Sequence, residues 1–297
     1  MPVTAPPAPA ASATWRRIRM DVLARIETLP SLSSVVVEFL ELSKREYFCA
    51  RDFEAILAKD QALVARLLKV ANSGLYARSR TVASIAEAVV LVGFEDMKRM
   101  IFSVSAAGLL RRSLENYAYV RPHGFWLHAT GVGLAARCVA RAAAPCPLRP
   151  DEAFVAGLLH DVGKLIIDDV LETAPGPRRV DLAEETSTIG LDHAELGEFI
   201  LAQWNLPPSI VEAVRRHHPG PDGRVPAVAA PVRLAQILCT GWGVGQQDPA
   251  DLGVEIDLTG HDDLLETLGL SAAKVPQVVW EIRQSLVGLE DRFCDAR

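Results

Sequence analysis

The chain has 297 residues, of which 49% are hydrophobic, and its formal net charge is -6. A chain of this length and composition can form one large domain or two smaller ones with a proper core. The mildly acidic balance excludes a global attraction to nucleic acid or to anionic membranes. No uninterrupted apolar run is long enough to span a bilayer, so we expect no membrane partner.

Cysteine usage and the N-terminal segment favour a cytoplasmic protein. The five cysteines are odd in number and form no CxxC pair, which is typical of reduced thiols rather than of a disulfide framework. The opening MPVTAPPAPAASAT lacks the charged start and apolar core of a signal peptide. Because it is rich in Pro and Ala, we predict that residues 1–14 are disordered.

Strand signals are weak along the whole chain, and Ala and Leu at helical spacing predict an all-α protein. The first helix is expected from Trp15 to Leu29. Another is expected in SIAEAVVLVG, with Ser84 as its N-terminal cap and Gly93 at its end. Together with the neighbouring segments, these helices predict an N-terminal helical lobe over residues 15–115.

The character of the sequence changes after this lobe, because all seven histidines follow it. We predict a second helical lobe over residues 116–240, in which the Pro- and Gly-rich stretch DVLETAPGPRRVDLAEETSTIG contains a loop. Residues 241–297 begin with the Gly-rich TGWGVGQQDP and then show two amphipathic helix patterns. This C-terminal extension either adds to the core or provides the face of a homodimer.

Helical phase places five histidines on apolar faces. His193 shares one side of its helix with Leu196 and Ile200, so its imidazole is expected to point inward. Asp161 directly follows a second of these histidines, His160, on a helix that is expected to begin at RPDEAF. The other four inward histidines are His128, His160, His217 and His218.

Two interpretations of this pattern stay open. A buried histidine is satisfied by a single hydrogen bond, so His160 and Asp161 could be held in the core for structure, with Lys164 paired to a carboxylate. However, five inward imidazoles and a carboxylate must all find partners in the interior. A shared divalent cation satisfies several of them together, and this ligand mixture suits Fe, Mn, Zn or Ni better than Mg or Ca.

The HD pair within GLLHDVGK, with His128 upstream, resembles the HD-domain metal-dependent phosphohydrolases. A closer resemblance is to the HDOD family, the HD-related output domain of bacterial signalling proteins. In the first lobe it rests on LPSLSSVVVEFLELS, ILAKDQALVARLLKVANSGLY and VASIAEAVVLVGFEDMKRMI. In the second lobe it rests on FWLHATGVGLAAR, DEAFVAGLLHDVGKLIID and ETSTIGLDHAELGEFILAQWNLPPSIVEAVRRHH. It runs from about Asp21 to His218 and implies an all-helical fold of two lobes.

The resemblance also implies a metal site for one or two divalent ions. Lys164 matches the basic residue that accompanies the HD pair near a substrate phosphate. Two positions depart from the pattern of the active enzymes: Gln236 replaces a late aspartate, and Pro219 replaces an acidic residue after the last two histidines. The lost carboxylate is expected to weaken the site. The implied ligands are His128, His160, Asp161, His193, His217 and His218.

These departures favour a signalling or regulatory module without turnover, which binds a protein partner or a small regulatory ligand. The alternative is a metal-dependent phosphohydrolase or phosphodiesterase that acts on a nucleotide or a cyclic dinucleotide. In that alternative a metal-bound water attacks phosphorus, and Lys164 is the one candidate catalytic side chain. Nucleic acid is not expected as a partner, because no basic-aromatic pattern is present.

Overall fold

The computed structural model contains helices as its regular elements, and it confirms the all-α prediction. Within the described residues, the single exception is an isolated bridge between Leu114 and Tyr119. The segment expected to be disordered, residues 1–14, lies outside the described part apart from its last two residues. The described ranges are 13–30, 34–42, 44–45, 47, 49–72, 82–117, 119, 123–171, 179–246 and 251–289.

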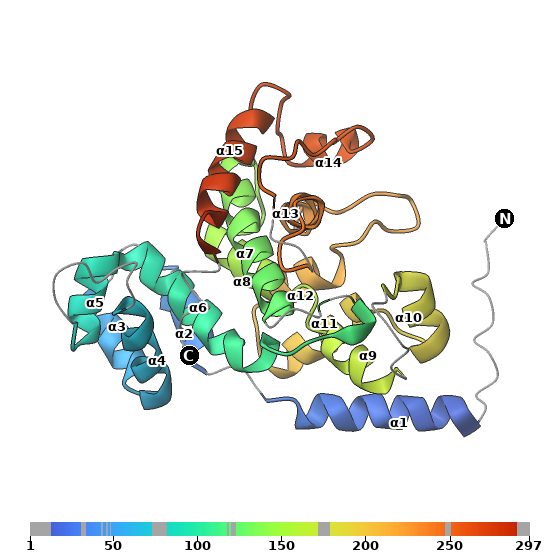
Figure 1. Cartoon of the computed structure of the whole chain (residues 1–297), viewed down its shortest axis with the longest axis horizontal. Helices are drawn as coiled ribbons and strands as arrows, with labels where there is room; N and C mark the ends of the chain where they lie inside the picture. The colour runs from blue at the N-terminus through green and yellow to red at the C-terminus, as the bar shows by residue number, and fades with distance from the viewer. Residues whose placement is uncertain are drawn as a thin grey trace.

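A first lobe, on the left in Figure 1, is formed by the helices that follow α1. Its core includes Phe53, whose ring contacts those of Phe39 and Phe94 edge-on at centroid distances of 4.8 and 5.0 Å. The predicted caps are confirmed, because the Ser84 hydroxyl accepts a backbone hydrogen bond and Gly93 follows α5 with φ 89°. The lobe comprises α2 (Ser34–Leu42), α3 (Ala50–Leu57), α4 (Gln61–Ala71), α5 (Ile85–Val92) and α6 (Phe94–Leu110).

A second lobe is built around α7, which lies at the centre of Figure 1 and packs on α8 and α13. The C-terminal helix α15 also packs on α7 and buries Val278, Ile282 and Leu286, so it extends this core. The elements are η1 (Glu115–Tyr117), α7 (Gly124–Ala142), α8 (Pro150–Leu159), α9 (Lys164–Val170), α10 (Leu182–Ile189), α11 (His193–Gln203), α12 (Pro208–Arg215), α13 (Ala230–Gly241), α14 (Asp262–Thr267) and α15 (Val275–Leu286).

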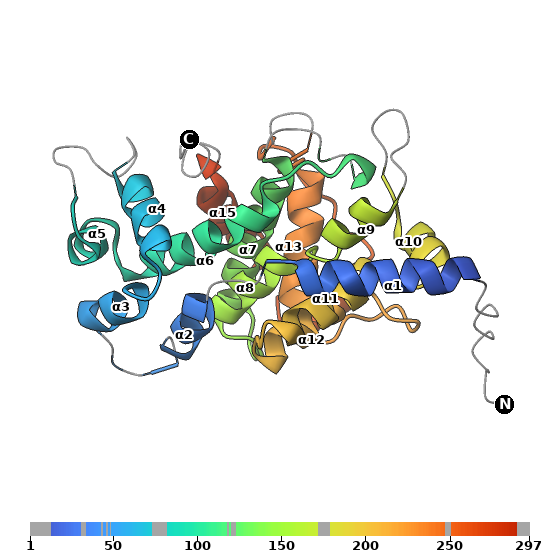
Figure 2. The same ribbon diagram turned by 90° about the horizontal axis from the view of Figure 1, so that it is seen from below.

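Helix α1 (Ala13–Thr28) packs on the second lobe, although the sequence grouped it with the first. It contacts α9 and α10, and Figure 2 shows it running along that side of the molecule. Val22 and Ile26, one turn apart, are buried there, and Arg25 lies 3.4 Å from Asp169. Spacing within α1 predicts an apolar face, but it does not show which lobe covers that face.

Helices α7 and α8 approach each other closely at a pair of glycines. A Cβ atom on Gly157 would lie 2.8 Å from Cα of Gly133, and one on Gly133 would lie 2.8 Å from the carbonyl oxygen of Phe154. Larger residues therefore do not fit at this crossing. The contact holds the end of α8, where His160 follows, against the helix that carries His128.

Buried charges connect the two lobes. Lys98 on α6 is 5% exposed and lies 2.7 Å from Asp151 on α8 and 2.8 Å from Glu95. Arg137 on α7 forms an ion pair with the same Glu95. Removing Lys98 would leave Asp151 without its partner at 2.7 Å, so the cluster ties α6 to α7 and α8.

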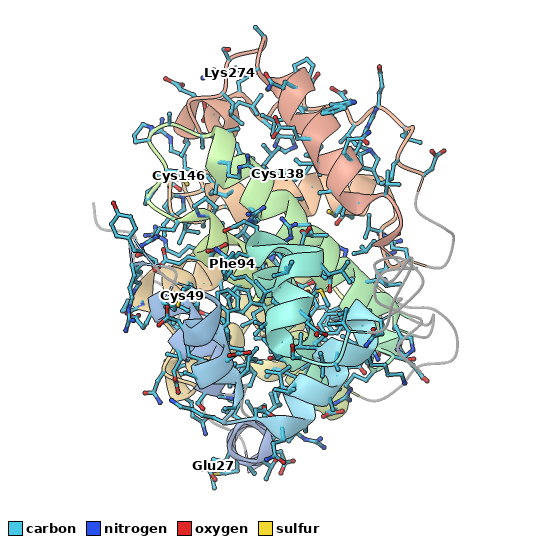
Figure 3. The ribbon with its side chains drawn as sticks, turned by 90° about the vertical axis from the view of Figure 1, so that its left-hand side faces the viewer. Glu27, Cys49, Phe94, Cys138, Cys146 and Lys274 are labelled. Carbon is cyan, nitrogen blue, oxygen red and sulfur yellow. The ribbon has the colours of Figure 1, made fainter. Side chains whose placement is uncertain are left out.

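The described cysteines are free thiols, as expected from their number and spacing. Figure 3 shows Cys49 in the first lobe, away from Cys138 and Cys146. Cys239 is buried in α13, and Cys294 lies outside the described residues. Among the helices that the structure describes, none combines the length and apolar character needed to cross a membrane.

Candidate metal centre

The structure brings all six predicted ligand residues together inside the second lobe. Neighbouring imidazole rings have centroids 4.1–5.5 Å apart. All of the six except His218 are at most 3% exposed. The six come from α7 (His128), the turn after α8 (His160 and Asp161), the start of α11 (His193) and the turn after α12 (His217 and His218).

His160 and Asp161 lie in a turn between α8 and α9, not within a helix as the sequence predicted. The Nδ1 atom of His160 donates to the carbonyl oxygen of Gly157 at 2.7 Å, and this carbonyl would otherwise accept from the next helical turn. His217 ends α12 in the same way, because its Nδ1 donates to the Val214 carbonyl at 2.6 Å. In both places an imidazole takes up a free carbonyl at a helix end.

Gly163 sets the distance between this turn and α11. A Cβ atom at this position would overlap the carbonyl oxygen of His193 and lie 2.8 Å from its carbonyl carbon. The turn that carries Asp161 can therefore rest directly on the residue that begins α11. As a result, Oδ1 of Asp161 lies 3.2 Å from Nε2 of His193.

Four of the histidines share one tautomer. Nδ1 of His160 and of His217 donates to a carbonyl oxygen at a helix end, as described above. In the same way, Nδ1 of His128 lies 3.2 Å from the carbonyl oxygen of Val244, and Nδ1 of His193 lies 2.8 Å from Oε2 of Glu185. Carbonyl and carboxylate oxygens can only accept, so Nδ1 is the donor in each case. A neutral imidazole that donates from Nδ1 has a lone pair on Nε2, and this nitrogen is left for the interior.

The interior is therefore rich in acceptors and poor in donors. Nε2 of His160 and Oδ1 of Asp161 are buried and have no hydrogen-bond partner in the described structure. Nε2 of His193 lies 3.4 Å from Nε2 of His217 and 3.0 Å from Nε2 of His218. Lone pairs that face one another in a buried space are unfavourable unless a cation or additional protons lie between them.

The protonation states suit a cation. Burial lowers the pKa of His128 to about 3 and that of His218 to about 2, and it holds the pKa of His217 well below its usual value. Burial alone would raise the pKa of Asp161, but the field of His160 and of the adjacent lysine outweighs it, and the pKa stays well below its usual range. Neutral imidazoles and an ionised carboxylate are the forms that bind metals.

Two groups of donors fit an ion. Within each group, one ligand atom per residue lies within 4.8 Å of the others. Zinc and similar ions hold nitrogen and oxygen ligands at about 2.0–2.2 Å, so small side-chain movements would complete either group. Asp161 lies between the two groups, because its Oδ2 atom is 3.2 Å from Nε2 of His160 and its Oδ1 atom is 3.2 Å from Nε2 of His193. The groups are His128, His160 and Asp161, and His193, His217 and His218.

Glu185 on α10 belongs to the site but was not expected there. It is 1% exposed and accepts hydrogen bonds at 2.8 Å from the Tyr117 hydroxyl and from both Nδ1 and the backbone N–H of His193. A carboxylate behind a ligand histidine fixes its tautomer and increases its basicity. The available signal was spacing, because Glu185 and the buried Ile189 lie one turn apart on α10.

The pKa of His193 reflects this arrangement. Burial and the charge of Lys164 lower it, but the contacts with the carboxylates of Asp161 and Glu185 outweigh them, and the net shift is upward. Lys164 lies 2.7 Å from Oδ2 of Asp161, as expected for a basic residue beside the HD pair. His193 therefore takes a proton more readily than His128, His217 and His218 when no cation is present.

The neutral Gln236 takes the place of the missing aspartate, and the cationic Arg233 lies beside it on α13. Oε1 of Gln236 accepts a hydrogen bond from Arg233 at 3.2 Å, so the amide oxygen is engaged within α13. Arg233 is half-buried, which lowers its pKa, and its charge helps to lower the pKa of His218. Pro219 is exposed and offers no ligand atom. This side of the site is therefore less attractive to a cation than a carboxylate would be.

Comparison with known proteins supports the fold. The family model of the HDOD domain matches residues 29–219. A curated relative, an uncharacterized protein of Treponema pallidum (strain Nichols), is 26% identical over 214 residues, which are 68% of this chain and 40% of the relative. The chain thus spans less than half the length of that relative.

Three solved structures are similar to this chain over almost its whole length. An HDOD domain protein of unknown function from Geobacter sulfurreducens is 23% identical with a TM-score of 0.66, covering 94% of this chain and 98% of its own. A candidate signal transduction protein from Marinobacter aquaeolei VT8 is 18% identical with a TM-score of 0.63, covering 95% of this chain and 66% of its own. A candidate metal-dependent phosphohydrolase from Shewanella amazonensis SB2B is 20% identical with a TM-score of 0.50, covering 94% of this chain and 99% of its own. At these identities the similarity establishes the fold alone.

Proposed function

Because this chain belongs to the HDOD domain family, we propose that it is a regulatory module whose second lobe holds one or two divalent transition-metal ions and whose output is binding rather than turnover. One observation carries the metal: the unpartnered Nε2 of His160 and Oδ1 of Asp161 face further Nε2 lone pairs in a buried space. Fe, Mn, Zn and Ni suit this mixture of imidazole and carboxylate.

The side chains at the two departing positions, Gln236 on α13 and Pro219 after α12, argue against efficient turnover. Hydrolysis at a metal centre needs an ion that holds and acidifies a water molecule, and carboxylates commonly orient that water. Gln236 is engaged with Arg233, and Pro219 has no acidic function. A bound ion would therefore stabilise the turn at Asp161 and its contact with α11 without completing a hydrolytic site.

The first lobe offers a surface for a signalling partner. Val90 and Leu91 are adjacent on α5 and are 83% and 44% exposed, which is unusual for large aliphatic side chains at the end of a packed helix. The ionic cluster of Lys98, Glu95 and Asp151 links that lobe to α8, and α8 leads directly into the HD pair. A change at the metal centre would thereby reach α6.

Elemental analysis of the purified full chain tests the metal. We expect one or two equivalents of a transition metal in the wild type and loss of most of it in His160→Ala. His261→Ala is the matched control, because His261 lies at the N-terminus of α14, outside the cluster, and should keep the wild-type content. Equal metal content in all three proteins, or none in the wild type after loading, would contradict the proposal.

The second candidate function is a metal-dependent phosphohydrolase or phosphodiesterase. Its support is Lys164, which lies beside Asp161 where it could balance phosphoryl charge. Metal-loaded wild type would be assayed with nucleotides and cyclic dinucleotides. Turnover above 1 per second, about the lower end of ordinary enzyme rates, that is lost in Asp161→Ala would favour this function over the first.

A further inference from the structure

The C-terminal extension contacts the candidate metal centre through the turn that follows α13. This turn, residues 242–246, lies against the first part of α7, the helix that carries His128. The carbonyl oxygen of Val244 in the turn is the acceptor for Nδ1 of His128 at 3.2 Å. Because the family model matches residues 29–219, this acceptor lies outside the matched part of the chain.

Gly245 brings the turn into direct contact with α7. Its φ is 76°, and a Cβ atom at this position would overlap the carbonyl oxygen of Gly124 and lie 2.7 Å from the backbone nitrogen of His128. A larger residue would therefore push the turn away from α7, in addition to the strain of a positive φ. The Val244 carbonyl reaches the imidazole because the residue after it has no side chain.

The side chain of Val244 is held in place by α15, which packs along α7 (Figure 1). A Cβ atom on Gly131, one turn after His128, would lie 2.8 Å from Cγ1 of Val244. It would also lie 3.5 Å from Cδ2 of Leu286 and 3.6 Å from Cδ2 of Leu289. Since protein interiors are close-packed, a displacement of α15 would either move Val244 or leave a void beside it.

Arg283 fixes α15 to the same turn. Its guanidinium donates a hydrogen bond to the carbonyl oxygen of Val254 at 2.9 Å and lies 5.5 Å from the centroid of the Trp242 ring. The indole N–H of Trp242, which is 2% exposed, donates to the same carbonyl at 2.9 Å. Trp242 is the first residue of the turn, so the turn and α15 share one acceptor.

We infer that the C-terminal extension controls the metal centre: α15 holds the 242–246 turn, and the turn fixes the tautomer and direction of the His128 imidazole. The inference rests on the proposed function and deepens it, because it names how that site is regulated. Without the Val244 acceptor, a neutral His128 can donate from Nε2, and an N–H then faces the position of the cation. A displacement of α15 would thus empty the donor group that contains His128, whereas the group that contains His193 keeps its hydrogen bond to Glu185.

Titration of Co²⁺ into the metal-free full chain, followed by the visible absorption of the bound ion, tests the inference. Gly245→Ala and Leu286→Ala should weaken binding at the His128 group by tenfold or more, the usual effect of losing the partner behind a ligand histidine. The remaining spectrum should match that of His128→Ala and not that of His217→Ala, because one donor group is disturbed and the other is not. Thermal melting would show which variants are folded, and Leu286→Ala carries the test if Gly245→Ala is not.

Two substitutions serve as matched controls and should bind Co²⁺ like the wild type. Gly243→Ala lies in the same turn with a similar φ of 71°, but a Cβ atom there meets no described atom within 4 Å. Val287→Ala directly follows α15 and changes a side chain that is 53% exposed. A difference between Gly245→Ala and Gly243→Ala therefore reports the contact with α7 and not the strain of a positive φ.

A second measurement does not depend on metal. Nitrogen-15 NMR of the histidine rings in the metal-free chain should find the His128 proton on Nδ1 in the wild type and both controls, and partly on Nε2 in Gly245→Ala and Leu286→Ala. Wild-type affinity and tautomer in these two variants, or equal weakening of both donor groups, would overturn the inference. If the wild type binds no Co²⁺ but the tautomer changes as expected, the proposed function fails and the positioning of His128 by the turn stands.

Discussion

The Nδ1 atom of His193 lies 2.8 Å from Oε2 of Glu185, and this contact determines where the other ring nitrogen points. Because the carboxylate can only accept, Nε2 carries the lone pair and is directed toward Asp161, 3.2 Å away. Helix α10 thereby orients a candidate ligand on α11, although α10 itself contributes no candidate ligand to the site.

Glu185→Gln should weaken metal binding about 10- to 100-fold, the effect usually seen when a carboxylate behind a ligand histidine is lost. The amide keeps the volume of the side chain but can donate to Nδ1, which would favour the wrong tautomer. Competition with a chromogenic chelator would measure the affinity. Glu184→Gln on the same helix is the control, and equal affinities of the two variants would show that Glu185 has no such role.

Gly163→Ala should destabilise the chain by about 1–3 kcal/mol, because the added methyl group meets the His193 backbone. Urea unfolding would measure the change. Gly108→Ala on α6 is a matched control, since a Cβ atom there meets no atom within 4 Å. That variant should be more stable by up to about 1 kcal/mol, the helix-propensity difference between Ala and Gly. The same sign for both substitutions would argue against the close contact.

Gln236→Asp should strengthen metal binding by about tenfold, or ~1.4 kcal/mol. A carboxylate attracts the cation, whereas the present amide is neutral and is engaged by Arg233. Gln236→Asn has the size of aspartate without its charge and should not strengthen metal binding. Competition with a chromogenic chelator would measure both affinities. If both variants changed the affinity alike, the effect would come from side-chain length and not from charge.

The stability of the metal-free chain should fall as pH is lowered from about 6.5. In the unfolded chain histidines protonate near pH 6.5, but in the folded chain His128 and His218 stay neutral until about pH 3 and 2. The unfolded state therefore binds more protons in this window, and each such histidine contributes a loss of about 1.4 kcal/mol per pH unit. His217 acts in the same direction.

His193 opposes this trend, because its pKa is raised on folding, and the stability it adds at low pH is lost as pH rises through that value. Because the pKa is lowered for three histidines and raised for one, the free energy of unfolding still falls as the pH is lowered. Urea unfolding of the metal-free chain at pH 7, 6 and 5 would measure it. Constant or rising stability toward pH 5 would contradict the lowered pKa values of the three histidines.

Periodicity in the sequence predicted the helices and the inward direction of the ligand histidines, because each is a local property of one helix. The caps at Ser84 and Gly93 were predictable for the same reason. The ends of α8 and α12 were not, because the imidazoles of His160 and His217 replace helical hydrogen bonds with side-chain ones. Such competition is decided by tertiary contacts.

The roles of Glu185 and α1 depended on contacts between distant segments. Glu185 lies in the Pro- and Gly-rich stretch that was expected to contain a loop, and its partner Tyr117 lies 68 positions earlier. The apolar face of α1 fits either lobe by composition alone. Likewise the sequence identified Gln236 as a departure, but its engagement with Arg233 required the fold.

Anomalous diffraction from crystals of the metal-loaded chain, recorded on both sides of the absorption edge of the metal, tests the central claim most directly. The account predicts a peak within coordination distance of Nε2 of His160 and of the Asp161 carboxylate, at about 2.0–2.2 Å from each. A loaded crystal without a peak there, or with its peaks at surface residues alone, would contradict it.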